Sequence, residues 1–399
     1  MFFYIEWWCI MHKIWLLIGV ILPIFLIGCN AVELPEPNIE DIDDDVKEDE
    51  NIGDDPLMIN CHTKEVMRIK STETLSAKML WENADTCDNL EFANNLVQMK
   101  DFNQKATLIT SDIFISDFRE LVPSWNVLLD NNSAVTFMIS VGNEAGYGDF
   151  YTMGYWKENY KASFSSQKDE YASVFIDTVV TKYDNIDRLK IKVIFKKTST
   201  GATKLKNISI TTKSIGSSND FNFNHLNEKI IDVEPRQQLS IPSIGNIICS
   251  PTSLSMLMNY YGVTDSQDEV AGKVFDEGAK IYGNWSFNAS YPGGFDNLYS
   301  RVEYIDSLSQ VMAYLENDTP LALSIKTNAK EDLVGSIMGY SSGHLVVLIG
   351  VKQIDEVWYA VVNDPAEYTD ESVEREYLLT ELLDAWRGYV YVVSDGEFN

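Results

Sequence analysis

Positive charge is scarce in this sequence. Its 399 residues include 31 Lys and Arg against 60 Asp and Glu, which gives a formal net charge of -29 at pH 7. So acidic a chain is disfavoured as a binder of nucleic-acid phosphates or of an anionic lipid surface. The sequence also contains no Gly-rich phosphate loop of the Gly-x-x-x-x-Gly-Lys-Ser/Thr type. Apolar residues make up 45% of the chain, so two ordinary domains could each bury a core.

An apolar run near the N-terminus has the features of a bacterial lipoprotein signal peptide. His12 and Lys13 precede the run 14–25, which leads through Leu-Ile-Gly to Cys29. We expect residues 1–28 to be removed and the thiol of Cys29 to carry lipid. The lipid would hold the protein on the extracytoplasmic face of the bacterial cell membrane. A retained membrane span is the alternative, but the run is short for one.

The segments on either side of this run are also informative. Residues 1–10 carry an acidic residue and no positive charge, so Met11 is a plausible start and Met1 opens an upstream extension. Residues 29–60 are dense in Asp and Glu, which predicts a disordered acidic tether. A calcium-binding loop is the alternative, but the acidic cluster 41–45 lacks regular ligand spacing and a turn glycine.

Cysteine is rare, with five residues in the whole chain. Cys9 lies within the signal peptide, Cys29 is the lipidation site, and Cys249 belongs to the site discussed below. This leaves Cys61 and Cys87. A disulfide can persist beyond the membrane, so we expect these two to be bridged, with two separate free thiols as the alternative.

Residues 61–215 have the pattern of an all-β domain. Short runs rich in β-branched and aromatic residues alternate between polar and apolar positions, for example in 134–141, 174–180, 189–195 and 205–210. In the absence of intervening helices, these runs predict a jelly-roll-like β-sandwich. Trp125 and Trp156 could stack on sugar, but core packing is the preferred interpretation. Residues 216–234 are expected to form an interdomain linker.

The segment Cys-Ser-Pro-Thr-Ser that begins at Cys249 presents a thiol at the start of a helix. Apolar residues at helical spacing follow it and end at Gly262, and Pro251 suits a first helical turn. A thiol at this position faces the positive end of the helix dipole and unpaired N–H groups, and both favour the thiolate. The alternative is a small buried residue in a core helix.

A second region supplies an imidazole and a carboxylate. His344 opens the apolar run 344–351 and Asp364 follows the run 358–363, and the two runs predict an antiparallel hairpin. A turn centred near Ile354 would put His344 directly opposite Asp364, with Cβ atoms about 4.5–5.5 Å apart. The carboxylate would then hold the imidazole in one tautomer, as in a catalytic base. Each residue alone is better explained structurally, but with a helix-start cysteine the set predicts catalysis.

Residues from about 235 to 394 resemble a papain-like cysteine peptidase, and we assign 235–399 to this domain. The group it resembles is related to the double-glycine leader peptidases, family thirty-nine of the cysteine peptidases, in a stand-alone bacterial lipoprotein form. Five segments in order carry the resemblance: 238–242, 249–256, 283–288, 343–347 and 363–366. Because the sequence contains no phosphate loop, we do not expect the chain to be the peptidase half of a transporter ATPase.

The resemblance implies roles for individual residues. They are Cys249 as nucleophile, His344 as general base and acid, Asp364 as orienting carboxylate and Gln238 as oxyanion-hole side chain. This chemistry needs neither a metal nor a cofactor. The chain departs from the family pattern at Ile248, where an aromatic residue is usual, and in the longer spacing from Gln238 to Cys249. Trp285 and Phe287 could line the cleft as substrate-binding residues, or could equally fill the core.

Helices and strands are mixed in the C-terminal domain. The pattern predicts helices over 251–261, 267–277, 305–317 and 378–386, and strands over 321–326, 344–351, 358–363 and 389–393. We therefore expect an α+β domain in which a thiol on a helix meets a His–Asp pair on a sheet. The predicted activity is hydrolysis of a peptide or protein substrate through a thioester acyl-enzyme. The alternatives are a cell-wall peptide amidase or acyltransferase on the same fold, and a catalytically silent surface-binding lipoprotein.

Overall fold

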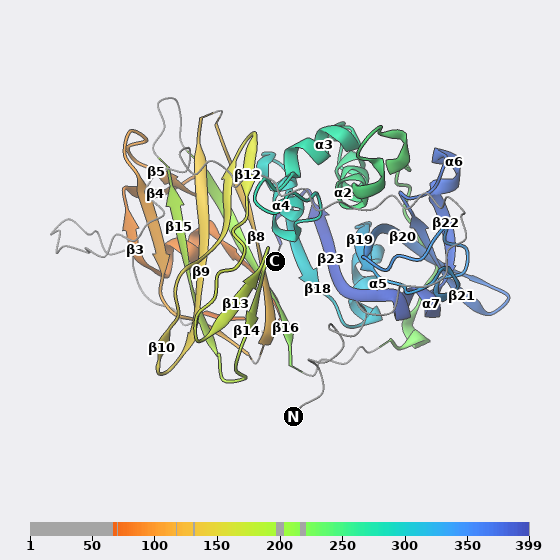
Figure 1. Cartoon of the computed structure of the whole chain (residues 1–399), viewed down its shortest axis with the longest axis horizontal. Coiled ribbons are helices and arrows are strands. Elements are labelled where there is room, and N and C mark those ends of the chain that lie inside the picture. The colour runs from red at the N-terminus through yellow and green to blue at the C-terminus, as the bar shows by residue number, and fades with distance from the viewer. Residues whose placement is uncertain are drawn as a thin grey trace, which may run out of the picture. The chain divides into compact units, whose positions relative to one another are not determined.

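The computed structural model describes residues 67–69, 71–116, 118–130, 132–196, 203–215 and 221–398. The predicted signal peptide, tether, lipidation site Cys29 and disulfide partner Cys61 lie outside these residues. The described elements form an all-β region followed by a region of mixed helices and strands (Figure 1). In this part of the chain no helix is both long and apolar enough to cross a membrane.

The first region is a sandwich of two sheets. The nine-stranded sheet consists of β1 (Met67–Ile69), β3 (Ala84–Asp88), β6 (Ala106–Thr110), β7 (Ile113–Ile115), β9 (Ala134–Asn143), β10 (Gly146–Tyr147), β11 (Tyr151–Lys157), β12 (Tyr160–Ala162) and β15 (Arg188–Phe195). The seven-stranded sheet consists of β2 (Thr72–Ser76), β4 (Leu90–Ala93), β5 (Leu96–Met99), β8 (Phe118–Leu128), β13 (Ala172–Phe175), β14 (Thr178–Thr181) and β16 (Lys204–Ser214). Pairings are antiparallel except that of β1 with β7. One short helix, α1 (Ala77–Glu82), follows β2.

Alternating side chains build the sandwich core. In β15 polar and apolar positions alternate, and the apolar ones are buried, as expected for a strand with one face on the core. Trp125 is fully buried and Trp156 is 4% exposed. The Trp125 ring stacks on Phe137 with centroids 4.1 Å apart, and it meets Trp156 edge-on. Both tryptophans therefore fill the core, as the preferred interpretation held.

The second region is α+β. Its seven-stranded sheet runs in the order β18 (Tyr299–Tyr304), β23 (Trp386–Ser394), β19 (Leu321–Ile325), β20 (His344–Ile354), β21 (Val357–Asn363) and β22 (Glu374–Leu378), with β17 (Lys229–Ile230) beside β20. Its helices are α2 (Cys249–Tyr260), α3 (Gln267–Val274), α4 (Trp285–Ser290), α5 (Leu308–Glu316), α6 (Asp370–Val373) and α7 (Leu379–Ala385). The predicted order of an all-β sandwich followed by an α+β domain is confirmed.

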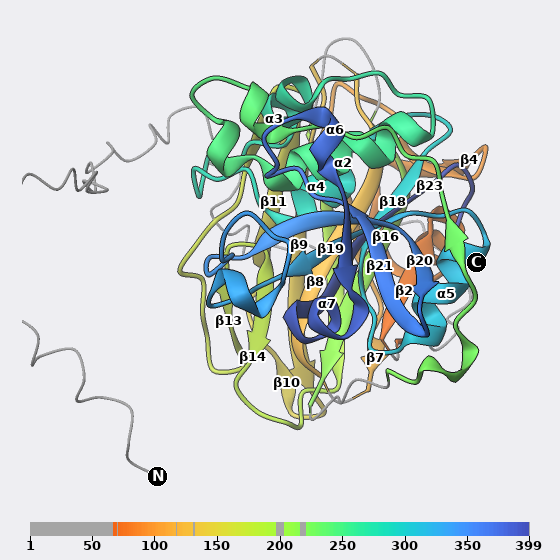
Figure 2. The ribbon, with the colours of Figure 1, turned by 90° about the vertical axis from the view of Figure 1, so that its right-hand side faces the viewer.

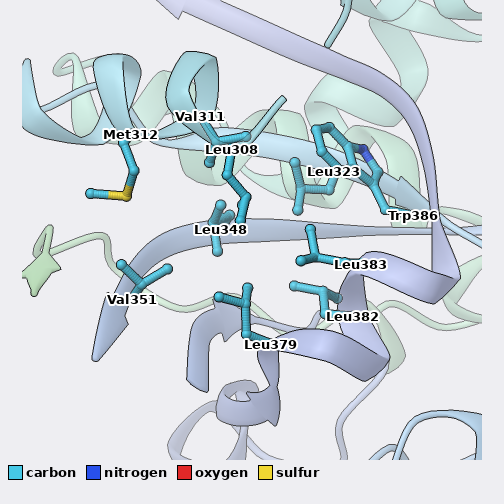
Figure 3. A pocket seen from close by; sticks show the side chains of 10 residues that line it. All are labelled: Leu308, Val311, Met312, Leu323, Leu348, Val351, Leu379, Leu382, Leu383 and Trp386. Atoms are coloured by element: carbon cyan, nitrogen blue, oxygen red, sulfur yellow. The ribbon is translucent and has the colours of Figure 1, made fainter. Parts of the chain in front are cut away.

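The sheet of the second region is covered on both faces. Helix α2 packs on one face of β20, and α5 and α7 lie on the other (Figures 1 and 2). Between α5, α7 and the sheet remains an apolar cavity of about 10 Å³, lined by residues such as Leu348, Leu382 and Trp386 (Figure 3). An apolar space of this size is expected to stay dry. The tight packing holds β20, and so its first residue His344, in place.

The two regions share a buried interface. Val122 of β8 joins the core of the α+β region, whereas Phe287 of α4 joins the core of the sandwich. The buried Asn126 side chain donates to the carbonyl of Ser300 at 2.7 Å and accepts from its N–H at 2.8 Å. Lys206 extends from β16 and donates to the Phe295 carbonyl at 2.9 Å. Through these apolar contacts and hydrogen bonds, the sandwich packs directly against the α+β region.

Some predicted boundaries differ from the structure. The helix expected over 267–277 ends at Val274, because Phe275 turns extended and Asp276 forms a bridge with Ile281 instead. The sequence pattern did not predict α4 or β18. Helix α4 has six residues and depends on its cap, Asn284, whose side chain accepts from the Phe287 N–H. Such a short helix is formed by its surroundings rather than by its own periodicity.

Candidate active site

Cys249 is the first residue of α2. The helix begins two residues earlier than the pattern predicted, and its following residues 250–258 are buried. Cys249 as a whole residue is partly exposed, and it is a free cysteine in the described part of the chain. A side chain in the first turn lies beside N–H groups that have no partner within the helix, and beside the positive end of its dipole. The helix start thus provides a setting that favours a thiolate.

His344 is the first residue of β20. Its backbone pairs with Ile325 of β19, and Gly343 before it has a φ of +93°, a conformation that suits glycine. The imidazole is only 4% exposed. The ring of Tyr340 stacks on it at a centroid distance of 4.1 Å and an interplanar angle of 16°. Strand pairing and stacking therefore fix the position of the imidazole from two sides.

Asp364 follows directly after β21, but the strand register differs from the prediction. Val347 pairs with Asn363, two residues away from the expected partner, so His344 is not directly opposite Asp364. The hairpin turn lies at Asp355–Glu356, where both residues have positive φ, and a bulge falls between Leu348 and Gly350. Bulges and turn positions shift a register without altering the apolar pattern, and this explains the error.

The imidazole and the carboxylate nevertheless meet. Nε2 of His344 lies 2.7 Å from Oδ1 of Asp364, and the carboxylate is fully buried. The same oxygen accepts from the Ala366 N–H at 3.0 Å. The other oxygen accepts from the hydroxyls of Tyr340 and Tyr377, at 2.8 and 2.7 Å. Four donors thus hold the carboxylate and satisfy its desolvated charge.

The thiol completes the arrangement. The side chain of His344 also hydrogen-bonds Cys249. Because Nε2 faces Asp364, the nitrogen that faces sulfur is Nδ1. The side chains of Cys249, His344 and Asp364 therefore follow one another from the sulfur through the ring to the carboxylate.

Electrostatics favour an ion pair in this line. Burial works to raise the pKa of Cys249, but the hydrogen bond and charge of His344, with backbone N–H groups, outweigh it and lower that pKa. Burial works to lower the pKa of His344, but the charge and hydrogen bond of Asp364 outweigh it and raise that pKa to about 10. The pKa of Asp364 is lowered because His344, Tyr377 and the Ala366 N–H overcome its burial. A thiolate beside an imidazolium is the nucleophile–base pair of covalent catalysis.

The other predicted site residues are placed as follows. Gln238 is 5% exposed and its Nε2 donates to the Gly245 carbonyl at 2.6 Å, while Oε1 has no partner in the described part of the chain. Trp285 is partly buried and its ring lies 5.0 Å from that of Tyr391. Phe287 is fully buried against the sandwich tryptophans. It fills the core, so the substrate-binding interpretation of Phe287 was wrong.

Two residues of the site were not found from the sequence. Tyr340 precedes His344 by four residues, and Tyr377 lies in the edge strand β22. Neither has a spacing that distinguishes it from the others among the 20 tyrosines of the chain.

Cys87 is disulfide-bonded in the structure, while its predicted partner, Cys61, lies outside the described residues. The described ranges contain no group of three or more His, Cys, Asp or Glu arranged to hold a metal ion.

The fold is an α+β domain preceded by an all-β sandwich, and the α+β domain brings a thiol, an imidazole and a carboxylate together. Comparison with known families identifies both domains. Residues 230–394 match the Peptidase C39-like family, and residues 90–212 match the Peptidase C39 N-terminal domain. The chain therefore carries a Peptidase C39-like family domain with a C39 N-terminal domain before it. The predicted family resemblance is confirmed, whereas its lipoprotein form stays a prediction.

Matches to individual proteins are distant. No curated protein matches the chain. Among solved structures, a GH26-CBM35 beta-(1,4)-mannanase of Podospora anserina is 11% identical, with 47% of this chain and 34% of that chain covered and a TM-score of 0.23. A family 6 carbohydrate-binding module is 12% identical, with 38% and 100% covered and a TM-score of 0.21. An uncharacterized protein from Burkholderia cenocepacia is 10% identical, with 81% and 77% covered and a TM-score of 0.16.

The chain spans about a third or less of the length of the first solved structures that it matches. With TM-scores this low, these likenesses support no argument about what the present chain binds or does.

Proposed function

We propose that this protein is a cysteine peptidase that hydrolyses peptide bonds through Cys249, His344 and Asp364. The observation that carries the proposal is the line of hydrogen bonds from thiol to imidazole to buried carboxylate. The Cys249 thiolate would attack the scissile carbonyl, and the His344 imidazolium would give its proton to the leaving amine. Water, deprotonated by His344, would then hydrolyse the thioester and release Cys249. Asp364 would keep the ring oriented through both steps.

We propose Gln238 as a donor to the oxyanion of the tetrahedral intermediate. An amide nitrogen has two hydrogens, and one of those of Gln238 is used by the Gly245 carbonyl. The second is available for a ligand, and the buried side chain cannot swing freely. A donor lost from an oxyanion hole typically lowers kcat by about 10²–10³. Replacement of Gln238 by Leu should therefore lower kcat far more than it raises KM.

The peptidase proposal is tested with Cys249→Ala in the otherwise complete chain. Wild-type protein should be labelled by iodoacetamide at Cys249 at neutral pH and should hydrolyse members of a fluorogenic peptide library. Cys249→Ala should lose both properties while its circular dichroism and Tm remain those of the wild type. His344→Ala should fold and lose hydrolysis as well. Full hydrolysis by Cys249→Ala would end the proposal.

We further propose that the protein is lipid-anchored at Cys29, on the extracytoplasmic face of a bacterial membrane. The support is the sequence pattern of the N-terminal segment, with a short positive region, an apolar run and a glycine before the cysteine. Mass spectrometry of the membrane fraction should find a mature protein that begins at Cys29 and carries acyl chains. An unmodified Cys29 in that fraction would refute the anchor. The peptidase proposal does not depend on this result.

A further inference from the structure

A turn of the sandwich inserts a carboxylate into the α+β region. Strands β13 and β14 are joined by the two residues Ile176 and Asp177, and Ile176 has a φ of +58°. Asp177 is only 6% exposed. One of its carboxylate oxygens accepts from the Thr178 hydroxyl at 3.0 Å, and the other accepts from the backbone N–H of Trp285. The sandwich therefore fixes the main chain at the first residue of α4.

The ring of Trp285 packs against two tyrosines of β23, and one of them contacts the helix that carries the proposed nucleophile. Its ring lies 5.0 Å from the ring of Tyr391 and 5.6 Å from that of Tyr389. The Tyr391 hydroxyl is hydrogen-bonded to Oγ of Ser250 at 2.9 Å, and Ser250 follows Cys249 in α2. Asp177 and the start of α2, which carries Cys249, are thus connected through Trp285 and Tyr391.

A second sandwich carboxylate binds Tyr389, the other tyrosine that packs against Trp285. The hydroxyl of Tyr389 donates to Oε2 of Glu120, on β8, at 2.7 Å. Tyr391 is 1% exposed, but Trp285 and Tyr389 are both only partly buried. Trp285 and Tyr389 therefore keep part of their surface open to solvent, whereas the enclosed ring of Tyr391 packs against that of Trp285. Aromatic surface held rigidly beside a reacting group is suited to binding an apolar side chain.

From these contacts we propose that the sandwich is a working part of the peptidase site. Its carboxylates Asp177 and Glu120 are positioning residues that hold Trp285 and Tyr389 as an aromatic platform. The platform receives an aromatic or large aliphatic side chain of the peptide, near the bond that Cys249 attacks. This inference rests on the proposed peptidase function and adds to it the class of substrate and the role of the N-terminal domain.

The test compares variants of the full chain in which the reacting groups are untouched. Asp177→Ala removes the acceptor of the Trp285 N–H, and Asp177→Asn retains an acceptor of the same shape. The matched control is Asp184→Ala, which changes an aspartate of the same domain whose side chain is 74% exposed. Each is assayed for kcat and KM on peptides that carry Phe, Leu, Ser or Asp in turn at each position, and for the rate of iodoacetamide labelling of Cys249.

Asp177→Ala should lower kcat/KM for Phe and Leu peptides about ten- to hundred-fold, mainly through KM, as expected for a displaced binding surface. Its labelling rate should stay within about two-fold of the wild type, because the small reagent does not need the platform. Asp177→Asn should restore most of the activity, and Asp184→Ala should match the wild type. Unchanged KM in Asp177→Ala, or labelling and hydrolysis that fall together, would overturn the proposal.

A binding measurement separates this proposal from the peptidase function. In a Cys249→Ala background, titration calorimetry with the same peptides should show tighter binding of those with Phe or Leu, and Asp177→Ala should weaken it about ten-fold. If the wild type is labelled but hydrolyses no peptide, the peptidase function fails. Calorimetry then still shows whether the aromatic platform binds Phe and Leu side chains. Trp285→Leu, which removes the platform directly, replaces Asp177→Ala if that variant does not fold. Equal affinity for all peptides would contradict the proposal.

Discussion

Asp364→Asn separates the charge of the carboxylate from its geometry. Asparagine has the same shape, so its oxygen can still accept from His344 and Ala366. Its amide nitrogen can donate to the hydroxyls of Tyr340 and Tyr377, which are able to accept. The variant therefore keeps the ring oriented and removes the negative charge that lies 2.7 Å from Nε2. A change in reactivity then reports the electrostatic contribution alone.

The size of this contribution follows from the geometry. Two unit charges about 4 Å apart at an effective dielectric constant of about 20 interact by about 4 kcal/mol, or about three pKa units. The direction is the same as that of the pKa of His344, which Asp364 and Cys249 raise against the opposing effect of burial. Without the charge, the imidazolium is weakened and the pKa of Cys249 rises. We expect labelling of Cys249 at pH 6 to fall at least about ten-fold.

The assay is the rate of iodoacetamide labelling of Cys249 between pH 4 and 10, followed by mass spectrometry. In the wild type the thiolate should persist well below pH 8.5, the ordinary value for cysteine, because the pKa of Cys249 is lowered. As the pH is lowered, labelling of Cys249 in Asp364→Asn should begin to fall at a higher pH than in the wild type. Asp384→Asn, the same change at an exposed position of α7, should leave the profile unchanged. Superimposable profiles for wild type and Asp364→Asn would refute the electrostatic argument.

Further variants at three positions test the surroundings of the site. Tyr340→Phe keeps the ring that stacks on His344 but removes one donor to the carboxylate, so kcat/KM should fall about ten-fold, and Tyr340→Leu, which also removes the stacked ring, should lose more. Asp177→Asn should raise the Tm at pH 8, because it removes a buried negative charge. At that pH the charge lowers the free energy of unfolding by about 3 kcal/mol, since the pKa of Asp177 lies about two pH units above its ordinary value. Burial raises this pKa to about 6, so the gain should be complete above pH 6 and absent below about pH 4 in thermal unfolding. Leu348→Ala would enlarge the apolar cavity and should cost about 2–5 kcal/mol in urea unfolding.

The sequence predicted the parts of the site that depend on local patterns. A proline after Cys249 and a run of helical spacing indicate a helix start, and a β-branched run after His344 indicates a strand. These signals lie within a few residues of the side chain concerned. The family match then agrees with the region in which they occur. The order of the two domains could be predicted for the same reason, since alternation and helical spacing are properties of short windows.

Contacts that cross the fold could not be predicted in this way. The register of the β20–β21 hairpin depends on a bulge, which adds a residue without changing the apolar pattern. Phe287 and Trp285 belong to one short helix, yet one is buried in the sandwich core and the other is partly exposed. Asp177 meets Trp285 across 108 residues. Such pairings are decided by the packing of the two domains, for which the sequence carries no local signal.

The net negative charge of the chain and the immediate neighbours of Cys249 act on the pKa of its thiol in opposite directions. A formal net charge of -29 would by itself oppose a thiolate, since like charges raise the pKa of an acid. Charges on the surface are screened within about 8–10 Å at moderate salt, whereas the His344–Asp364 pair is buried and close to the sulfur. The imidazolium and the backbone N–H groups therefore dominate the pKa of Cys249, and the direction of its shift is downward. Reactivity at this cysteine is thus set by its immediate neighbours and not by the overall charge of the protein.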